Sequence, residues 1–544
     1  MKRRILVLLI AFVIFESYGQ TPTIKWQNCY GTQNTWNTGR GIVETENEYL
    51  IATGINDDVG APNYHGGGDI WLIETDTLGN KIWESCYGGS ESDGAYKLIS
   101  RNDQYYILAA TQSTDGDVQS NNNGGLDYWV IKLDSEREII WEKCYGSPGN
   151  EAPRDMIVTP DGGVVVMGRI FNSGGDVSVL YGSNDVWMFK TDSLGNLEWE
   201  KTLGNQWNDN GVSIMLNSEG NIILIGAVAH YGGMVECNTD DYYGDVWLVE
   251  LDLQGNIVSQ HCYGGSYYDL GFSVIEVDAG YIFAAGSSSN DGDVSGHHGP
   301  AGIAPNGWPD IWVVKIDLQG EIIWQKSIGG YDSEFPMYIT QTEDSGIVVI
   351  GLTSSNDGDV SGNHSNPDLM NVSDIWVVKL SPDGEIEWQQ CYGGLGSEYL
   401  ESPQTILKKS DYNYVIASST DYGPSYDVEC TPTGGNYIDK DVLIFEISLD
   451  DTTALHESLP GSGNLDVYPN PATDWAVFNY NLADSNAEGV IKIMDSKGSF
   501  ITSLSISGMQ GQKVWDTRKL KAGVYFYTLK VAGYSISGKI VVSK

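Results

Sequence analysis

The sequence has few basic residues for its length. Its 544 residues include 30 Lys and Arg against 73 Asp and Glu, which gives a formal net charge of −43. Residues 465–544 carry six acidic and nine basic side chains, and residues 1–19 carry one acidic and three basic, so residues 20–464 hold a net charge of about −48. Such a charge argues against nucleic acid or an anionic membrane surface as a partner. It favours cations, or simply solubility.

Several patterns that indicate other kinds of protein are missing. After residue 19 no segment keeps an apolar period of 3.6 residues, which excludes long amphipathic helices, and no apolar run reaches membrane-spanning length. No C-x-x-C supports a zinc site. No G-x-S-x-G, H-E-x-x-H or phosphate-binding loop indicates a catalytic centre. Acidic residues are plentiful, so a carboxylate pair for glycoside cleavage stays open, although nothing singles one out.

The first 19 residues have the organisation of an export signal. Three basic residues at 2–4 precede the apolar run Ile5–Phe15, which is too short to span a bilayer comfortably. Small residues at 17 and 19 offer a cleavage site that leaves Gln20 first, and no Cys stands near it for a lipid anchor. We therefore expect an exported protein with no transmembrane segment.

A unit of 57 to 65 residues recurs seven times. Its first landmark is an Asp two residues before a large apolar residue, at Asp69, Asp127, Asp185, Asp245, Asp310, Asp374 and Asp441. Its second is W-x-x-C-Y-G, complete or degraded, with glycines at 31, 88, 146, 204, 264, 329 and 393. A repeat of this length is typical of a solenoid, an array or a propeller.

Each unit contains four predicted strands. After Gly146 they are 155–159, 164–168, 186–190 and 197–203, rich in β-branched and aromatic residues and separated by Gly, Asp and Asn. The chain begins with a lone fourth strand, Ile24–Tyr30, and its last unit stops after a third strand, Val442–Ile447. The sequence thus predicts an all-β fold, a seven-bladed β-propeller over residues 20–447 whose N-terminal strand completes the last blade.

The repeat resembles the secreted seven-bladed β-propeller repeats over about residues 24–447. The resemblance implies the propeller fold. It implies little about activity, because propellers carry many unrelated functions.

The C-terminal region differs from the repeats. Residues 448–464 are polar with Gly, Ser and Pro, and are interpreted as a linker. Residues 465–544 contain seven short predicted strands, which indicate a small Ig-like β-sandwich. Three motifs lie in it: Tyr468, Pro469, Asn470 and Pro471; residues 491–495; and residues 520–526, with Gly523 and Tyr525.

These three motifs resemble the type A C-terminal sorting domain of the type IX secretion system. The resemblance implies that the signal peptide carries the chain across the inner membrane and that the type IX machinery, as a partner, carries it across the outer membrane. In that family the sorting domain is usually removed, and the cargo is released or attached to surface lipopolysaccharide. An ordinary accessory sandwich domain is the alternative.

Five of the seven cysteines share one repeat position. They are Cys29, Cys86, Cys144, Cys262 and Cys391, and Thr202 and Ser327 replace them in the other two units. Equivalent positions of neighbouring blades should lie too far apart for a disulfide, so we expect a small packing site. Cys237 and Cys430, each in Val-Glu-Cys, lie in long loops, and their pairing across the ring is left open.

Candidate binding residues come from the loops. Twelve of the 17 Trp stand at the two landmarks, where we expect them to pack one blade on the next rather than stack on sugars. Trp36, Trp207 and Trp308 lie outside the landmarks. The loops after each second strand are long, and strand alternation brings them to the same face as the loops that enter the next unit. Binding sites favour loops on a rigid scaffold, so ligand contacts are predicted at Trp36, Trp207, Trp308, His298 and His364.

A repeated acidic motif, Asp-Gly-Asp-Val, lies in three of these long loops. Its carboxylates are Asp115, Asp117, Asp291, Asp293, Asp357 and Asp359. Carboxylates two residues apart with a bending Gly suit Ca²⁺, so these residues are the predicted calcium ligands. The alternative is that the motif forms Asx turns that fix the shape of each loop.

Two functions fit these observations. The first, which we prefer, is a monomeric, non-catalytic binding or adhesion module that is secreted or held at the cell surface and presents its loops to a glycan or protein ligand. The second is a secreted propeller hydrolase or lyase that acts on polysaccharide.

Overall fold

The computed structural model describes residues 23–543 with gaps. The gaps are 32–36, 38, 47, 57–59, 121, 230–231, 238–242, 300–307, 365–371, 422–423, 430–439, 450–463, 469–471, 474, 482–487, 496–499, 509 and 532–533. The predicted signal peptide 1–19 and most of the predicted linker 448–464 lie outside the described residues. The chain divides into two compact units, Met1–Leu449 and Asp450–Lys544.

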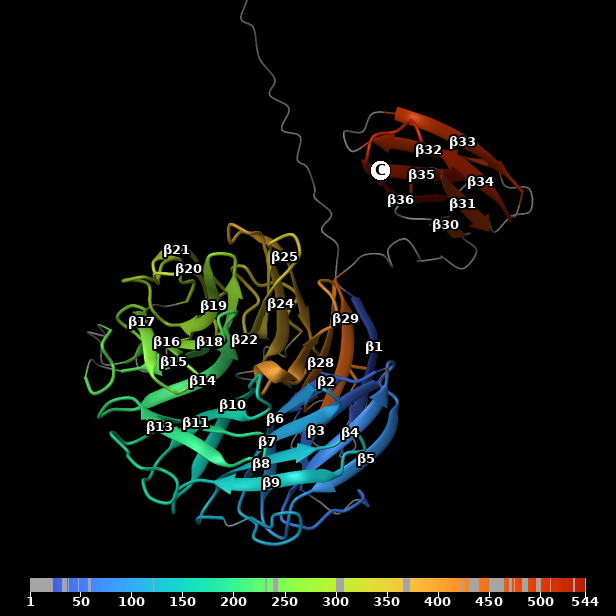
Figure 1. The fold of residues 1–544 in the computed structure, drawn as a ribbon. Coiled ribbons are helices and arrows are strands. Elements are labelled where there is room, and N and C mark those ends of the chain that lie inside the picture. Colours follow the sequence, from blue (N-terminus) through green and yellow to red (C-terminus); the bar gives the residue numbers. More distant parts are fainter. Residues whose placement is uncertain are drawn as a thin grey trace, which may run out of the picture. The chain divides into compact units, whose positions relative to one another are not determined.

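The described part of the first unit consists of seven antiparallel sheets, which we call blades 1 to 7 (Figure 1). Blade 1 contains β2 (Gly41–Glu44), β3 (Glu48–Ile55), β4 (Asp69–Asp76) and β5 (Lys81–Tyr87), and blade 2 contains β6 (Asp93–Arg101), β7 (Gln104–Thr111), β8 (Asp127–Leu133) and β9 (Ile139–Tyr145). Blade 3 contains β10 (Glu151–Val158), β11 (Val164–Ile170), β12 (Asp185–Thr191) and β13 (Leu197–Leu203), and blade 4 contains β14 (Asp209–Leu216), β15 (Ile222–Val228), β16 (Asp245–Leu251) and β17 (Ile257–Tyr263). Blade 5 contains β18 (Asp269–Val277), β19 (Gly280–Ser287), β20 (Asp310–Asp317) and β21 (Ile322–Ile328), and blade 6 contains β22 (Glu334–Gln341), β23 (Ile347–Thr353), β24 (Asp374–Leu380) and β25 (Ile386–Tyr392).

Blade 7 closes the ring with strands from both ends of the unit. It contains β26 (Glu398–Tyr399), β27 (Ile406–Lys408), β28 (Asn413–Thr420), β29 (Asp441–Ser448) and the N-terminal strand β1 (Thr23–Tyr30). In the β1–β29 ladder Trp26 lies opposite Glu446 and Gln27 opposite Phe445. The predicted closure and the all-β propeller fold are thus confirmed.

The two sets of landmark Trp residues hold the blades together, as predicted. In blades 1 to 6 the third strand carries a Trp that is at most 3% exposed. The Nε1 of this Trp donates to a Glu or Gln 13 residues later, on the fourth strand. The Trp of a fourth strand instead covers a turn glycine of the next blade, as Trp141 does over Gly195. The third-strand Trp is thus bonded to its own blade and lies in a core shared with the preceding blade, as Trp129 and Trp187 do, and the fourth-strand Trp packs on the next blade.

Blade 7 departs from the repeat at the centre of the ring. Its inner strand is divided into β26 and β27 by the short 3₁₀ turn η1 (Pro403–Thr405), the orange turn near the axis in Figure 1. From this turn the Nε2 of Gln404 donates to Asp155 Oδ1 in blade 3 at 3.3 Å. Asp155 is buried, pairs with Lys97 of blade 2 and accepts from Ser213 of blade 4. This polar network joins four blades across the central channel.

The second unit consists of two sheets packed on a common core. One contains β30 (Asn464–Tyr468), β31 (Trp475–Asn481) and β34 (Gln510–Asp516), and the other contains β33 (Phe500–Ser507), β32 (Glu488–Asp495), β35 (Gly523–Val531) and β36 (Tyr534–Val542). Phe478, Trp515 and Tyr527 are buried between them. This is the predicted β-sandwich.

Candidate functional site

The long loops and the loops between blades meet on one face, as expected from strand alternation. In blades 2 to 7 the backbone N–H of a long-loop residue donates to the carbonyl of the glycine that follows the previous blade's last strand, as Asp117 does to Gly88 and Asp359 to Gly329. We call this the long-loop face. Each of these long loops is thus tied to the loop that leads into its own blade.

The carboxylates of the acidic motif fasten these loops. Asp115 Oδ1 accepts from the backbone N of Ser90 at 2.8 Å, and Asp117 Oδ2 accepts from that of Gly88 at 3.1 Å. The copies in blades 5 and 6 do the same, with Asp291, Asp293, Asp357 and Asp359 accepting from the loops that precede β18 and β22. The contacts are those of a loop-shaping motif. Among the described residues no group of three or more His, Cys, Asp or Glu is arranged to hold a metal ion, and calcium binding stays a prediction.

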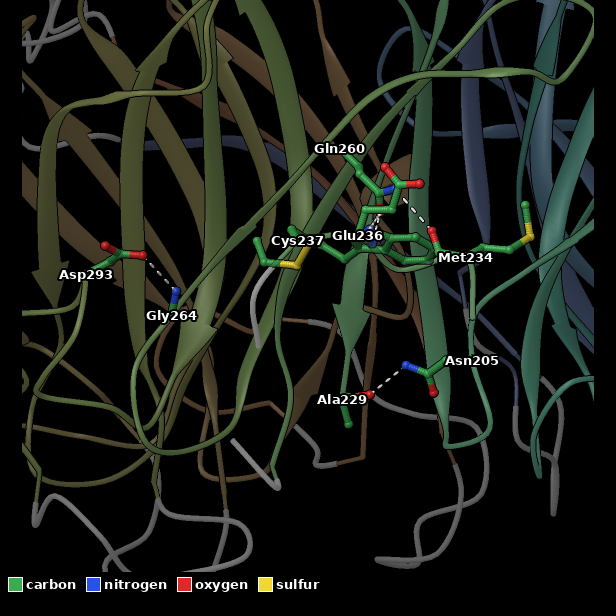
Figure 2. The surroundings of a disulfide bond; sticks show 10 residues. Asn205, Ala229, Met234, Glu236, Cys237, Gln260, Gly264 and Asp293 are labelled. Carbon is green, nitrogen blue, oxygen red and sulfur yellow. Dashed lines mark hydrogen bonds between the residues drawn. A yellow bond between two sulfur atoms is a disulfide. The ribbon is translucent and has the colours of Figure 1, made fainter. Parts of the chain in front are cut away.

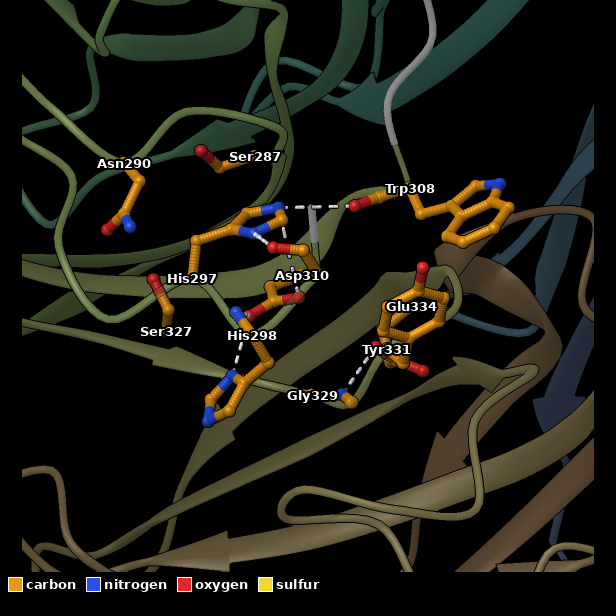
Figure 3. A network of polar contacts seen from close by, with 12 residues as sticks. Ser287, Asn290, His297, His298, Trp308, Asp310, Ser327, Gly329, Tyr331 and Glu334 are labelled. Atoms are coloured by element: carbon orange, nitrogen blue, oxygen red, sulfur yellow. Dashed lines mark hydrogen bonds and ion pairs between the residues drawn. The ribbon is translucent and has the colours of Figure 1, made fainter. Parts of the chain in front are cut away.

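The two candidate histidines bridge neighbouring blades. His298 has its Nδ1 2.7 Å from Asp310 Oδ2 and its Nε2 3.4 Å from Asp359 Oδ2 (Figure 3). His364 has its Nδ1 2.9 Å from Asp374 Oδ2, and that hydrogen bond raises the pKa of His364. Both side chains are engaged at blade joints, and a ligand-binding role for them stays a prediction.

Six blade joints bury a pair of carboxyl groups. The pairs are Asp69 with Asp93, Asp127 with Glu151, Asp185 with Asp209, Asp245 with Asp269, Asp310 with Glu334, and Asp374 with Glu398. Each pair flanks the last glycine of the W-x-x-C-Y-G landmark or its degraded copy. At Gly146 a Cβ would lie 2.4 Å from Asp127 Oδ1 and 2.5 Å from Glu151 Oε2, so a side chain there would displace the pair. Figure 3 shows Asp310 and Glu334 at one joint.

Burial favours the protonated form of a carboxyl group in these pairs. It raises the pKa of Asp69 and Asp269 to about 6, of Asp127 and Glu334 to about 7, and of Asp209 to about 8. In the pair at Gly204, Oδ1 of both Asp185 and Asp209 lacks a hydrogen-bond partner among the described residues. A proton shared between the two carboxyl groups satisfies both oxygens. At the seventh joint the buried Asn37 stands in place of the second acid, beside Asp441.

A disulfide excludes the pairing of Cys237 with Cys430 that the sequence left open. Cys237 is bonded to Cys262 of the same blade, with Cα atoms 5.6 Å apart (Figure 2). The long loop turns back along β17, and Gln260 Nε2 donates to the carbonyl of Met234 at 3.1 Å. The repeat cysteine position faces the long loop in other blades too, since Thr202 Oγ1 donates to Val179 O at 2.6 Å.

The remaining cysteines behave differently from one another. Cys86 and Cys391 are buried and free, in agreement with a packing site, and burial raises the pKa of Cys86 to about 12. Cys29 on the closing strand is disulfide-bonded. Cys430 lies outside the described residues.

A pocket on the long-loop face spans blades 3 to 5. Its volume is about 370 Å³. It is lined by aromatic, amide and basic side chains, namely Trp207, Tyr243, Tyr268, Asn184, Asn208, Asn210 and Arg169, and by the backbone around Ala227–Ala229. Trp207 is 44% exposed. Of the two candidate Trp residues that the structure describes, Trp207 lies in this pocket and Trp308 does not. Trp308 packs on Tyr331 near blade 6, and Trp36 lies outside the described residues.

A second set of residues surrounds the channel mouth beside this pocket. Five inner strands carry a β-bulge at the same level, which adds Tyr96, Arg154, Val212, Phe272 and Met337. Arg40 and Glu401 hold the equivalent positions of blades 1 and 7, where they pair at 3.4 Å. The Arg40 guanidinium also lies 5.4 Å from the centre of the Tyr96 ring. The bulges therefore gather residues of several blades at the mouth.

Sequence reasoning missed both the mouth and the acid pairs. A bulge has no sequence signature of its own, so the channel-facing residue of each strand was not evident. The acid pairs did leave a signal, because an Asp or Glu follows the landmark glycine by five residues in six units.

Comparison with known proteins identifies the second unit. A family model described as a secretion system C-terminal sorting domain matches residues 466–543. The C-terminal unit is a type IX sorting domain. Gly523 and Tyr525 of its predicted motifs lie in β35, and Pro469, Asn470 and Pro471 lie outside the described residues. The sorting domain directs the chain through the type IX machinery to the extracellular space or the cell surface.

The chain is similar to several solved structures at low sequence identity and low TM-score. A polysaccharide lyase of family PL25, an ulvan lyase, is 10% identical with a TM-score of 0.44, over 72% of this chain and 93% of that one. The endosialidase of phage phi92 is 8% identical with a TM-score of 0.37, over 82% and 71%. A prolyl endopeptidase is 8% identical with a TM-score of 0.38, over 82% of this chain but 55% of that one. No curated protein matches the sequence. Within the described residues no helix is long and apolar enough to cross a membrane.

Proposed function

We propose that this chain is a secreted, non-catalytic binding protein that holds a glycan in the pocket beside Trp207. The observation that carries the proposal is the lining of that pocket. Three aromatic rings offer apolar faces on which sugar rings stack, and three Asn side chains offer both donors and acceptors for hydroxyl groups. A few convergent polar groups in an otherwise aromatic cavity are typical of small-molecule sites.

The loops that form the pocket are held rigidly. Asn184 Nδ2 donates to Asn208 Oδ1 at 3.0 Å, and the backbone N of Trp207 donates to Asn205 Oδ1 at 2.8 Å. The Tyr243 ring stacks on that of Tyr267 with centres 6.0 Å apart. Because these contacts fix the lining before a ligand arrives, little ordering is required on binding.

Replacing Trp207 by Ala is expected to weaken glycan binding by about tenfold or more, because a stacked, desolvated aromatic ring contributes at least about 1.4 kcal/mol. The measurement is a glycan-array screen of the mature chain, followed by titration with the best glycan. Trp308→Ala is the matched control, since Trp308 is 38% exposed on the same face but outside the pocket. Equal losses for both variants would contradict the assignment.

The same screen decides between binding and catalysis. Incubation of each bound polysaccharide with the mature chain is expected to yield no shortened or unsaturated product. Product formation that a single carboxylate substitution abolishes would favour the hydrolase or lyase alternative.

A further inference from the structure

We propose that the channel mouth binds an anionic group of the ligand, a carboxylate or a sulfate ester on an acidic polysaccharide, between Arg154 and Arg169. This inference rests on the proposed function, because it names the chemical class of the glycan that occupies the neighbouring pocket.

The distribution of arginine carries the first step. Residues 20–464 hold a net charge of about −48 and contain only five arginines. Two of them have evident structural partners: Arg101 donates to the carbonyls of Val158 and Thr159, and Arg137 pairs with Glu74. The other three, Arg40, Arg154 and Arg169, come together at the channel mouth.

The second step is that two of these three guanidinium groups lack a partner. Nε of Arg154 and Nε of Arg169 are both buried without a hydrogen bond, and no carboxylate of the described residues pairs with either side chain. Burial, followed by the nearby charges of Arg169 and Arg40, lowers the pKa of Arg154. A half-buried cation with no partner is unfavourable, and like charges side by side add to that cost. An anion placed between the two arginines offsets both terms.

The third step links the arginines to the pocket. Arg169 follows Gly168 on β11 and lines the pocket itself. Tyr268, which also lines the pocket, lies within electrostatic reach of Arg169 and Arg154. Below the arginines, Asp155 is fully engaged by Lys97, Ser213 and Gln404. The pocket therefore has Arg169 in its lining, and Arg154 lies within electrostatic reach of Arg169.

The test is calorimetric titration of the mature chain with polygalacturonate, dextran sulfate and neutral dextran. We expect binding of at least one of the two acidic polymers, no binding of dextran, and affinity that falls as salt rises. The double variant Arg154→Gln and Arg169→Gln is expected to weaken that binding by about a hundredfold, because each charge-assisted hydrogen bond contributes roughly a factor of ten. Binding of polygalacturonate would identify the anionic group as a carboxylate, and binding of dextran sulfate would identify it as a sulfate ester.

The control variants show whether a loss of binding comes from the charges at the channel mouth or from a change in charge anywhere on the protein. Lys143→Gln with Lys326→Gln removes the same two charges from the outer strands β9 and β21 and is expected to leave binding unchanged. Arg154→Lys keeps the charge and is expected to retain most of the affinity, which distinguishes an anion site from lost packing.

Several outcomes would overturn the proposal. They are binding of neither acidic polymer, equal loss in the outer-strand control, and loss in Arg154→Lys as large as in Arg154→Gln. Binding of a neutral glycan that needs Trp207 but not the arginines would overturn this inference while supporting the proposed function. Failure to bind any glycan would overturn both.

Discussion

A chain that lacks residues 23–30 is expected to lose the cooperative unfolding of its propeller. Strand β1 supplies seven residue pairs to β29, all eight residues of which are buried. Without β1 the edge of β29 is bare, and Trp26 no longer packs on the Tyr49 ring of blade 1. Because ring closure couples blade 7 to blade 1, the loss opens the whole toroid. Differential scanning calorimetry of the mature and truncated chains measures the effect.

Two variants show whether the strand itself is responsible. Lys25→Ala removes a half-exposed ion pair with Glu446 and an exposed hydrogen bond to Asn413, each of which contributes about 1 kcal/mol at most, so the melting temperature should change little. Cys29→Ser keeps the strand but removes its disulfide, and should lower the melting temperature without abolishing the transition. A truncated chain that melts like the parent would show that the ring does not depend on closure.

Replacing Asp209 by Asn is expected to stabilise the propeller at pH 8. In the unfolded chain Asp209 ionises near pH 4, whereas in the folded chain its pKa is about 8. The folded state therefore binds more protons than the unfolded state between these values, and stability falls as pH rises through this window. Asn cannot ionise, its amide can donate to Asp185 Oδ1, and its size matches. The stability that Asp209→Asn adds relative to the parent chain should therefore increase from pH 5 to pH 8.

The same reasoning predicts the behaviour of the parent chain. Because the carboxyl groups at five joints have a raised pKa, the melting temperature of the parent chain should be higher at pH 5 than at pH 8. Carboxyl groups with lowered pKa, such as Asp161 and Asp344 at about 2, act in the opposite sense but only below about pH 4. A melting temperature that rises from pH 5 to pH 8, or that rises at pH 8 only when Ca²⁺ is added, would mean that the pairs hold a cation rather than a proton.

Much of the fold follows from short-range patterns. The predicted strand at 197–203 matches β13, and the predicted strands at 24–30 and 442–447 are each within one residue of β1 and β29. These segments were predictable because alternating β-branched residues and turn glycines act locally. The sequence did not reveal that η1 divides the inner strand of blade 7, because Pro403 at the start of η1 belongs to neither repeat landmark.

The site was only partly predictable, because it depends on contacts between units. The long-loop face followed from strand alternation, and Trp207 was identified as a loop Trp outside the repeat. Arg154 stood out in no pattern, because its position in the channel results from a bulge and its neighbour Arg169 lies on another strand. The bond between Cys237 and Cys262 depends on how a long loop folds back, and spacing alone does not give that path.

The most direct test of a ligand site at the channel mouth is hydrogen–deuterium exchange of the mature chain with and without an acidic polysaccharide that it binds. Protection is expected in the segments 151–156, 167–170, 205–210 and 243–245 and around Tyr268, with none in the outer strands β9 and β21. Protection confined to the outer surface beside the Cys237–Cys262 disulfide, or to the face opposite the long loops, would contradict it.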